Sequence, residues 1–402
     1  MSARDASASA DVVIMGGCGH VGLPLGIALA DRGLTTILYD LNDEAVASVT
    51  RGVTPFWEPG AEEKLEAALR SGVLSATTDP GALSKADAVV VVIGTPVDEH
   101  LNPDPQAVPD AIAAVADHLR DGQLLILRST IYPGVTALVE QLLSRLGLKV
   151  DVAFCPERIA EGRAMTELYE LPQIVSARTE RAYERAATIF RNLTDSIVRL
   201  EPEEAELAKL FTNTWRYIKF ATANQLYMIA NDYGLDFERI RSALALDYPR
   251  AADLPRAGFA AGPCLFKDTM QLAAFNNNNF MLGHAAMLVN EGLPLYVVSR
   301  LERRFDLADM TVGIAGMAFK AESDDTRSSL SYKIKRILEF KAARVLCTDP
   351  YVTSDPDLVP FEEVLEQADL IVVGAPHAEY AKLVGDKRVI DVWNVAGDGV
   401  LV

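Results

Sequence analysis

The chain has few cysteines and few cations, and each shortage argues against a class of protein. Its 402 residues include 4 cysteines, none of them in a CxxC pair. This usage fits a reducing cytoplasm better than a disulfide framework. The net charge of -18 disfavours binding to nucleic acid, because an acidic protein repels phosphate at long range. A phosphorylated ligand must therefore be captured by a few local cations and backbone N–H groups.

Long apolar segments are also absent. No run of apolar residues approaches the roughly 20 residues that a membrane-spanning helix needs. The first residues, MSARDASASA, lack the apolar core of a signal peptide, so we expect a disordered tail over 1–10. We expect a cytoplasmic protein without nucleic acid or membrane partners. With 50% hydrophobic and 23% charged residues, a chain of this length predicts two or three ordinary globular domains.

The first half of the chain alternates strands and helices. Residues 11–16 (DVVIMG) form an apolar run that predicts a strand, and LPLGIALADRG, after the next glycines, has its apolar residues at helical spacing. Helical stretches separate the further strands that the sequence predicts, at 35–40, 86–96, 123–130 and 149–157. Such alternation is typical of a parallel sheet covered on both faces. We therefore expect a Rossmann domain over residues 11–202.

The pattern changes after residue 202. Residues 203–304 show long helical periodicity with almost no strand signal. Strand-like runs then return and echo the first domain, since VLCTDP resembles ILYDLN and EQADLIVVGAPHAEY resembles KADAVVVVIGTPVDEH. We expect a second, shorter Rossmann-like domain over 305–402, whose incomplete glycine turn disfavours dinucleotide binding. The predicted fold class is α/β, with two doubly wound parallel-sheet domains joined by a long central helical segment.

A GxGxxG turn lies between the first predicted strand and helix. It contains Gly17, Gly19 and Gly22 in the segment GGCGHVG. In such turns the glycines allow a tight bend, a close approach of pyrophosphate to the backbone and close helix packing, and the helix N-terminus faces the phosphates. Asp40 ends the next strand, where a carboxylate accepts hydrogen bonds from both ribose hydroxyls and repels a 2′-phosphate. The motif predicts NAD binding rather than a merely structural turn.

Polar residues also follow the later strands, at the edge where ligands bind in such sheets. Thr95 and Pro96 end one strand, and Thr130 ends the next. Thr130 is suited to bond a catalytic water or an acid, although a capping or turn role is equally compatible with the sequence. Glu157 and Glu161, in PERIAEG, lie at helical spacing suited to proton transfer, but a solvated helix start explains them equally well.

One cysteine lies among reactive residue types. Cys264 is in GFAAGPCLFKDTMQL, with Lys267 three residues later and Asp268 next to that lysine. A thiolate is able to hold a carbonyl carbon covalently, and a neighbouring ammonium favours the thiolate over the thiol. A buried structural cysteine is the alternative, since free cysteine often behaves as a small apolar residue.

Three polar residues share one face of the predicted central helix. Lys209 and Asn213 are four residues apart, and Asn224 follows eleven residues later. At about 100° per residue, these offsets place all three on one side of the helix. They form either a stripe that binds an oxyanion and hydroxyl groups or a polar stripe that faces solvent. The 5 histidines show no metal-binding spacing, and we expect no metal.

At this point the chain resembles the UDP-glucose/GDP-mannose dehydrogenase family of NAD-dependent nucleotide-sugar 6-dehydrogenases. The resemblance extends over nearly the whole chain after the tail. It rests on segments in a fixed order: GTPVDEHLNPD, RSTIYPG, CPERIAEG, AELAKLFTNTWRY, GFAAGPCLFKDTMQL and GMAFKAESDDTRSS. It implies a four-electron oxidation of a sugar CH₂OH group to a carboxylate, with two NAD used in succession. It also implies a homodimer or higher homo-oligomer formed through the central helix.

The resemblance assigns the central chemical step to Cys264. It implies that this thiol traps the intermediate aldehyde as a thiohemiacetal, which a second oxidation converts to a thioester that water hydrolyses. Lys209 and Asn213 match positions that stabilise the developing oxyanion. The resemblance therefore assigns the oxyanion partner to Lys209 rather than Lys267.

Proton transfer is assigned by the same resemblance. Asp268, with Thr130 through water, matches positions that handle protons. Glu161 matches the acid assigned to thioester hydrolysis, and Glu157 lies in the same motif. The catalytic residues that we expect are Cys264, Lys209, Asn213, Asp268, Thr130, Glu161 and Glu157.

Binding roles also follow from the resemblance. Arg327 matches a residue that reaches a cofactor of a neighbouring subunit, and Lys320 matches a substrate contact. The residues expected to hold NAD are Gly17, Gly19, His20, Val21, Gly22, Asp40, Thr95, Pro96, Thr130 and Arg327. Those expected to hold the nucleotide sugar are Glu157, Arg158, Ile159, Lys209, Asn213, Arg256, Gly258, Phe259, Gly262, Phe319 and Lys320.

The sequence leaves the sugar open. PERIAEG and the segment around Cys264 resemble the UDP-N-acetylhexosamine branch, whereas Glu161 is typical of UDP-glucose enzymes. DVWN, at 391–394, replaces an arginine-containing segment of many UDP-glucose enzymes. We expect a UDP-hexose 6-dehydrogenase that makes a UDP-hexuronate from UDP-glucose or a UDP-N-acetylhexosamine for glycan synthesis. The alternatives are a TDP- or GDP-sugar 6-dehydrogenase, a two-electron 3-hydroxyacid-type dehydrogenase and a non-catalytic nucleotide-sugar sensor.

Overall fold

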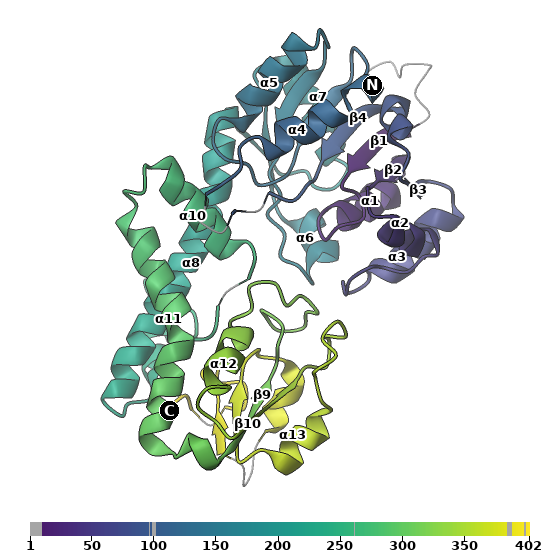
Figure 1. Ribbon diagram of the computed structural model, residues 1–402. Coiled ribbons are helices and arrows are strands. Elements are labelled where there is room, and N and C mark those ends of the chain that lie inside the picture. Colours follow the sequence, from purple (N-terminus) through teal and green to yellow (C-terminus); the bar gives the residue numbers. More distant parts are fainter. Residues whose placement is uncertain (1–9, 96, 99–101, 261, 384–387, 398) are drawn as a thin grey trace. The chain divides into compact units, whose positions relative to one another are not determined.

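The computed structural model describes residues 10–95, 97–98, 102–260, 262–383, 388–397 and 399–402 (Figure 1). The predicted tail lies outside the described residues except for Ala10, with which the first strand begins. The chain divides into two compact units, Met1–Phe211 and Thr212–Val402. Across the described part of the chain, no helix combines the length and the apolar character that a membrane crossing requires.

The first unit is built on an eight-stranded sheet in the order β3-β2-β1-β4-β5-β6-β7-β8. Neighbouring strands are parallel except β6 and β7, which pair antiparallel at Phe154 and Ser176. The strands are β1 (Ala10–Met15), β2 (Thr36–Tyr39), β3 (Leu74–Thr77), β4 (Ala86–Val91), β5 (Leu124–Leu127), β6 (Asp151–Phe154), β7 (Gln173–Ser176) and β8 (Ile197–Leu200). The sequence did not indicate β3, β7 or β8, because LSAT, QIVS and IVRL contain no three consecutive apolar residues.

Side chains of β1 alternate between two cores, one on each face of the sheet. Val12 and Ile14 belong to the core formed with α1, α3, α6 and α7. Val13 and Met15 belong to the core formed with α4 and α5. A strand that is buried on both faces reads as an uninterrupted apolar run, which is the pattern that predicted it. The helices of this unit are α1 (Gly22–Asp31), α2 (Asp43–Thr50), α3 (Ala61–Arg70), α4 (Ala107–Ala114), α5 (Val135–Arg145), α6 (Ala164–Glu170) and α7 (Glu180–Phe190), with the short 3₁₀ helices η1 (Pro80–Lys85) and η2 (Ala116–His118).

Helix α8 (Pro202–Asp232) begins in the first unit and continues into the second. Its first turns are fixed by Glu206, which is 1% exposed. The Glu206 carboxylate accepts the backbone N–H groups of Gly134 (2.6 Å) and Thr136 (2.9 Å) and the Thr136 hydroxyl (2.6 Å). These N–H groups lie at the N-terminus of α5, where a negative charge is stabilised by the helix dipole. The same contact fixes the helix that carries Lys209 one turn later.

The second unit contains a four-stranded parallel sheet in the order β10-β9-β11-β12. Its strands are β9 (Thr311–Ala315), β10 (Arg344–Thr348), β11 (Leu370–Val373) and β12 (Arg388–Ile390). Its helices, after α8, are α9 (Phe237–Ala245), α10 (Leu265–Phe275), α11 (Met281–Arg304), α12 (Leu330–Leu338) and α13 (Phe361–Gln367), with η3 (Leu307–Asp309) and η4 (Ala378–Lys382). The predicted fold class, two parallel-sheet α/β parts and a long helix between their sequences, is confirmed.

Helices from the middle of the chain share a core with the second sheet. Tyr227 of α8, Val297 of α11 and Ile334 of α12 lie in one cluster with Val312 of β9. The opposite face of the sheet packs against α13 through Val364 and its neighbours. The predicted three-part division, 11–202, 203–304 and 305–402, stays a prediction.

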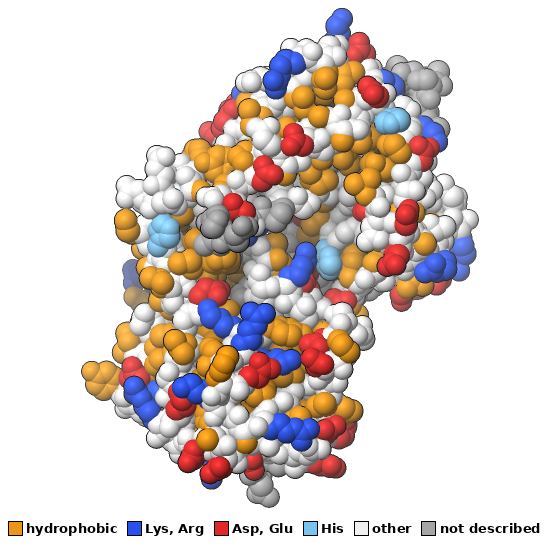
Figure 2. Space-filling model, in the orientation of Figure 1, with side chains coloured by type: hydrophobic (Ala, Val, Ile, Leu, Met, Phe, Trp, Pro, Cys, Tyr) orange, Lys and Arg blue, Asp and Glu red, His pale blue; other side chains and the backbone are white. Residues whose placement is uncertain are grey.

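Charged side chains of both signs are scattered over the face of the molecule in Figure 2, with hydrophobic side chains between them. The net charge of -18 is therefore not gathered into one field on that face. Capture of a phosphorylated ligand then depends on nearby cations and backbone N–H groups.

Candidate active site

The turn between β1 and α1 has no room for a Cβ atom at Gly16, Gly17 or Gly22; at Gly17 this atom would lie 2.8 Å from the carbonyl oxygen of Ile14. Gly16 has a φ of +80°, and a Cβ atom there would lie 1.9 Å from the carbonyl oxygen of Val92. At Gly22, the first residue of α1, a Cβ atom would lie 2.3 Å from the carbonyl oxygen of Gly16. Only glycine fits at such distances. The GxGxxG spacing selected Gly22 but missed Gly16, whose place directly after the strand was the available signal.

Gly19 differs, because the protein itself leaves room for a side chain there. The nearest atom to an added Cβ would be the Gly16 carbonyl oxygen at 3.8 Å. Val21, the N-cap residue of α1, provides no side-chain cap to the helix N–H groups. His20 stacks on Phe56 with ring centroids 4.0 Å apart. Open space beside a helix N-terminus without a side-chain cap is what a pyrophosphate needs, so the turn fits NAD.

Asp40 lies directly after β2 and contacts this turn. Its Oδ2 accepts the N–H of Cys18 at 2.9 Å, and its Oδ1 accepts the N–H of Asn42 at 3.0 Å. The half-buried carboxylate is placed as a ribose contact requires. Burial, and then the charge of Asp40, raises the pKa of Cys18 to about 12, so this thiol stays protonated.

The loops after β4 and β5 are linked to each other. The hydroxyl of Thr95 donates to the carbonyl oxygen of Thr130 at 2.6 Å, and the N–H of Ile93 donates to the hydroxyl of Ser129 at 2.8 Å. Thr95 therefore shapes the edge of the sheet whether or not it contacts a cofactor. Thr130 lies half-buried at this edge. Pro96, also predicted to hold NAD, lies outside the described residues.

The first acid of PERIAEG belongs to a buried ion pair. Glu157 accepts a hydrogen bond from Arg128, with 2.9 Å between Nε and Oε2, and the Arg128 side chain is 0% exposed. The other oxygen of Glu157 accepts the N–H groups of Arg158 (2.7 Å) and Ile159 (3.0 Å). These bonds favour a role for Glu157 in holding the loop in place rather than in proton transfer. Arg128 was not among the predicted site residues, although an arginine directly after an apolar strand is a visible signal.

Glu161 lies in the same loop, close to contacts made by Glu58. Glu58 is 7% exposed, and its carboxylate accepts the N–H groups of Gly162 (2.7 Å) and Ala164 (2.8 Å). The interpretation of Glu157 and Glu161 as a solvated helix start is wrong, because the helix begins only at Ala164 and the preceding segment is a loop held by buried carboxylates. Glu58 was missed because its partners follow 104 and 106 residues later.

Cys264 has the exposed thiol of this protein. The other three cysteines, Cys18, Cys155 and Cys347, are buried, and burial raises the pKa of each to about 12. Cys264 is the N-cap residue of α10. A helix N-terminus favours the thiolate form of a cysteine placed there. The alternative of a buried structural cysteine is therefore wrong for Cys264.

Asp268 lies one turn into α10 and is 0% exposed. Its Oδ2 accepts an N–H of the Asn213 amide on α8 at 2.5 Å, and its Oδ1 lies 3.3 Å from the ammonium of Lys267. The second unit thus brings together Asn213 and Asp268, two of the predicted catalytic residues. Asn213 is 4% exposed, so a stripe facing solvent is wrong for this residue. Lys209 lies one turn earlier on α8 and is half-buried.

Asn224, the third residue of that stripe, binds protein groups at both ends of its amide. Its Nδ2 donates to the carbonyl oxygen of Gly258 (3.0 Å) and to the Asn290 side chain (2.9 Å). Its Oδ1 accepts the N–H of Gly258 at 2.9 Å. Asn224 is 1% exposed, so its side chain is buried and does not face solvent. It fixes Gly258, the first glycine of GFAAG, which is called the glycine-rich segment below.

Aromatic rings pack directly against the glycine-rich segment. A Cβ atom at Gly258 would lie 2.2 Å from the Trp393 ring, and one at Gly262, where φ is +102°, would lie 2.5 Å from the Phe319 ring. Trp393 also donates its indole N–H to the carbonyl oxygen of Gly374 at 3.1 Å. Trp393 belongs to DVWN (391–394), a segment that was singled out for its lack of an arginine and not for its tryptophan. At both glycines, an aromatic ring therefore occupies the space that the side chain of another residue would need.

Two predicted binding arginines make ion pairs on the surface. Arg256 is 3.5 Å from Glu238, and its side chain is 54% exposed. Arg327, with 56% exposure, binds Asp325 at 2.6 Å. Lys320 is half-buried in the same segment as Arg327. Any ligand of the two arginines has to compete with these carboxylates.

The second sheet has a comparable turn, and the protein's own side chains fill it. Gly316 (φ +98°) follows β9, and Asp349 follows β10 as Asp40 follows β2. Asp349 Oδ2 accepts the N–H groups of Met317 (2.7 Å) and Ala318 (2.9 Å) and lies 3.0 Å from Nε2 of His377. Because these turn N–H groups are occupied, the arrangement supports the expectation that this domain binds no dinucleotide.

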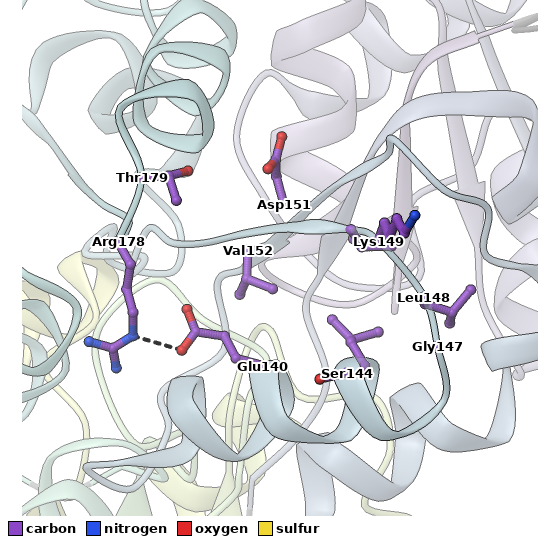
Figure 3. Close-up of a pocket in the computed structure, with 11 residues that line it drawn as sticks. Glu140, Ser144, Gly147, Leu148, Lys149, Asp151, Val152, Arg178 and Thr179 are labelled. Atoms are coloured by element: carbon purple, nitrogen blue, oxygen red, sulfur yellow. Dashed lines mark hydrogen bonds and ion pairs between the residues drawn. The ribbon is translucent and has the colours of Figure 1, made fainter.

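The first unit contains a pocket of about 410 Å³. It is lined by the end of α5, residues 147–152 leading into β6, and Arg178 and Thr179 after β7 (Figure 3). Arg178 binds Glu140 at 2.7 Å across it. The pocket is at the amino end of β6, whereas ligands of such sheets bind at the carboxyl ends of the strands.

Comparison with known proteins gives a family match along the chain. The UDP-glucose/GDP-mannose dehydrogenase family matches through its NAD binding domain at residues 11–194, its central domain at 203–291 and its UDP binding domain at 313–398. The three matches follow the order that the sequence motifs predicted, so the predicted resemblance and the NAD cofactor are confirmed.

Individual relatives cover most of the chain. A UDP-N-acetyl-D-mannosamine dehydrogenase of Pyrococcus horikoshii is 31% identical over 90% of this chain and 89% of the relative. An NDP-N-acetyl-D-galactosaminuronic acid dehydrogenase of Ralstonia nicotianae is 29% identical, with 92% of each chain covered. The structure of a UDP-glucose dehydrogenase from Pyrobaculum islandicum superposes with a TM-score of 0.89 at 29% identity, over 97% of this chain and 95% of that one.

Asp40 is expected to determine the preference for NAD over NADP. Asp40→Asn removes the charge that repels a 2′-phosphate, which is worth about 1 kcal/mol or more, and should lower the NAD/NADP ratio of kcat/KM by about five- to tenfold. Asp43→Asn, an equal charge change on exposed α2, is the control and should leave the ratio unchanged. Steady-state rates with both cofactors test this, and an unchanged ratio in Asp40→Asn contradicts it.

Proposed function

The chain belongs to the UDP-glucose/GDP-mannose dehydrogenase family, and from this premise we propose that it oxidises the C6 alcohol of a UDP-sugar to a carboxylate. It is an NAD-dependent nucleotide-sugar dehydrogenase that acts on CH–OH groups. The observation that carries the four-electron proposal is Cys264, an exposed thiol at a helix N-terminus beside the buried Asn213–Asp268 pair. A two-electron oxidation has no need of such a thiol.

The proposed reaction balances as one alcohol, two NAD and one water giving one carboxylate, two NADH and three protons. NAD, when bound, accepts a hydride in each of the two oxidations. Between them, the thiolate of Cys264 adds to the aldehyde carbon and forms a thiohemiacetal, so the aldehyde is not released. The second oxidation leaves a thioester on Cys264. Water then breaks the C–S bond, releases the carboxylate and restores the thiol.

The other residues have supporting roles in this proposal. Lys209 and Asn213 stabilise the oxyanion that develops on the substrate oxygen. Asp268, held by the Asn213 amide, accepts the proton of the alcohol, and Thr130 assists through water. Glu161 activates the water that cleaves the thioester. Glu157 contributes by fixing the same loop through its pair with Arg128.

We favour a UDP-N-acetylhexosamine as the substrate. Relatives named UDP-N-acetyl-D-mannosamine dehydrogenase align along 90% and 96% of the chain. UDP-glucose is the second candidate, because a protein described as a UDP-glucose dehydrogenase has nearly the same fold, with a TM-score of 0.89. Both sugars carry the primary C6 alcohol that the chemistry requires.

A second copy of the chain is the proposed partner. On α8, Leu226 and Ile229 are 40% and 50% exposed, and Tyr233, in the turn directly after the helix, is 80% exposed. The spacing of three residues places Leu226 and Ile229 on one face of the helix. An exposed apolar stripe on a helix indicates a protein interface. We therefore propose a homodimer formed through α8.

NADH stoichiometry tests the proposed reaction. With a panel of UDP-, TDP- and GDP-sugars and NAD, we expect two NADH per UDP-N-acetylhexosamine oxidised, because both oxidations occur before release. One NADH per substrate would indicate a two-electron dehydrogenase and contradict the proposal. Saturable binding of the panel without any NADH formation would favour a non-catalytic sensor instead.

Replacement of the thiol tests the covalent step. Cys264→Ala should still bind the UDP-sugar but lose uronate formation by about a thousandfold or more, since the aldehyde has no covalent partner. Cys347→Ala, which removes a buried thiol, is the matched control and should keep the activity. Uronate production at the native rate by folded Cys264→Ala would overturn the mechanism.

Disruption of the α8 stripe tests the dimer. Ile229→Glu places a charge in the proposed interface and should convert the dimer to monomers, as measured by light scattering after size-exclusion chromatography. Leu146→Glu alters a residue of similar exposure, 48%, away from α8 and should leave the mass unchanged. A dimeric Ile229→Glu variant would argue against this interface.

A further inference from the structure

We propose that His377 is a positioning residue of the nucleotide-sugar site, which fixes the segment 317–325 that carries Phe319 and Lys320. The inference rests on the proposed function, in which this segment contacts the UDP-sugar. His377 itself lies between β11 and η4, outside this segment, and is 0% exposed. Its role is therefore to act through other residues rather than to touch the substrate.

Both ring nitrogens of His377 are hydrogen-bonded. Nδ1 accepts the backbone N–H of Glu322 at 3.0 Å, and Nε2 lies 3.0 Å from Oδ2 of Asp349. Since Nδ1 accepts, the ring proton is on Nε2 and is donated to Asp349. A neutral imidazole accepts the hydrogen bond from Glu322 and donates the one to Asp349. A ring with a proton on both nitrogens has no acceptor and would lose the bond to Glu322.

Asp349 connects His377 to the start of the segment. The oxygen that faces His377 also accepts the N–H groups of Met317 (2.7 Å) and Ala318 (2.9 Å). Its other oxygen accepts the N–H of Tyr351 at 2.9 Å. Burial alone would raise the pKa of Asp349, but the hydrogen bonds from His377 and from these N–H groups outweigh it and hold the pKa below its usual value. Asp349 is thus a charged acceptor that His377 keeps in place.

Glu322 connects His377 to the middle of the segment. Its φ of +49° is in the left-handed region, which is unusual for a residue other than glycine. Besides its N–H bond to His377, its carboxylate accepts the N–H of Ala378 at 2.9 Å and the hydroxyl of Tyr351. These bonds lower the pKa of Glu322, with the Ala378 contribution the largest. The strained conformation is stable because three partners hold it.

Phe319 and Lys320 lie between these two fixed points. Phe319 packs against Gly262, where an added Cβ would lie 2.5 Å from its ring, and Gly262 precedes Cys264 by two residues. A shift of residues 318–322 therefore displaces a ring that shapes the glycine-rich segment. His377 bonds one end of this stretch directly, at the Glu322 N–H, and the other through Asp349, so loss of its two hydrogen bonds should loosen the UDP-sugar site.

Two substitutions at His377 separate hydrogen bonding from bulk. His377→Phe keeps a ring but removes both bonds, whereas His377→Gln retains an acceptor and a donor about as far apart as the two ring nitrogens. For His377→Phe we expect the KM for the UDP-sugar to rise about tenfold, with kcat changed less than about threefold. His377→Gln should stay within about threefold of the wild type. Tyr351→Phe removes only the hydroxyl bound to Glu322 and should raise the KM by a smaller factor. If His377→Phe does not fold, this variant tests whether fixing of Glu322 affects the KM for the UDP-sugar.

Binding measurements keep the result separate from the proposed function. Calorimetry with UDP should show about tenfold weaker binding to His377→Phe, and NAD binding to all variants should match the wild type. If the wild type binds UDP but forms no NADH with any sugar, the proposed function fails and the UDP titrations still test His377. Native UDP affinity and KM in folded His377→Phe would overturn the proposal, as would equal losses of UDP and NAD binding.

Discussion

The hydrogen bond from a backbone N–H group to a buried or half-buried carboxylate holds the loops of this protein in place. Four segments have acceptors of this kind: Asp40 for the glycine turn, Glu58 and Glu157 for the PERIAEG loop, Glu206 for the start of α5, and Asp349 for the turn after β9. A loop at a strand end leaves N–H groups without sheet or helix partners, and burial makes unpaired donors costly. A charged acceptor satisfies several of them at once.

These carboxylates account structurally for part of the acidic composition. Part of the negative charge is internal, where it is balanced by N–H dipoles, helix N-termini or a cation such as Arg128. The glycine turn after β1 is the contrasting case, because there Asp40 accepts the N–H of Cys18 while the N-terminus of α1 has no side-chain cap. The corresponding turn after β9 is filled by Asp349 and His377. The two related turns therefore differ in how far a carboxylate of the protein occupies their N–H groups: Asp40 accepts the N–H of Cys18, and Asp349 accepts those of both Met317 and Ala318.

Features with local sequence signals were predictable. The apolar run of β1, the glycines after it and Asp40 at the end of β2 form one short pattern, and Cys264 lies in a distinctive segment. Residues whose partners lie far along the chain were not predictable from local pattern, as Glu58 shows with bonds to residues 104 and 106 positions away. Asn224 also shows the limit of helical spacing, which gave the shared face correctly but not the burial that occupies its amide.

The distribution of cysteines also determines how the protein meets oxidants. Three thiols are buried and stay protonated, so their sulfur atoms are poor targets for peroxide or alkylating reagents. Chemical damage by such reagents is then directed to Cys264, the position on which the proposed turnover depends. Oxidation or alkylation of a molecule at Cys264 should therefore abolish its proposed turnover before it affects the buried core.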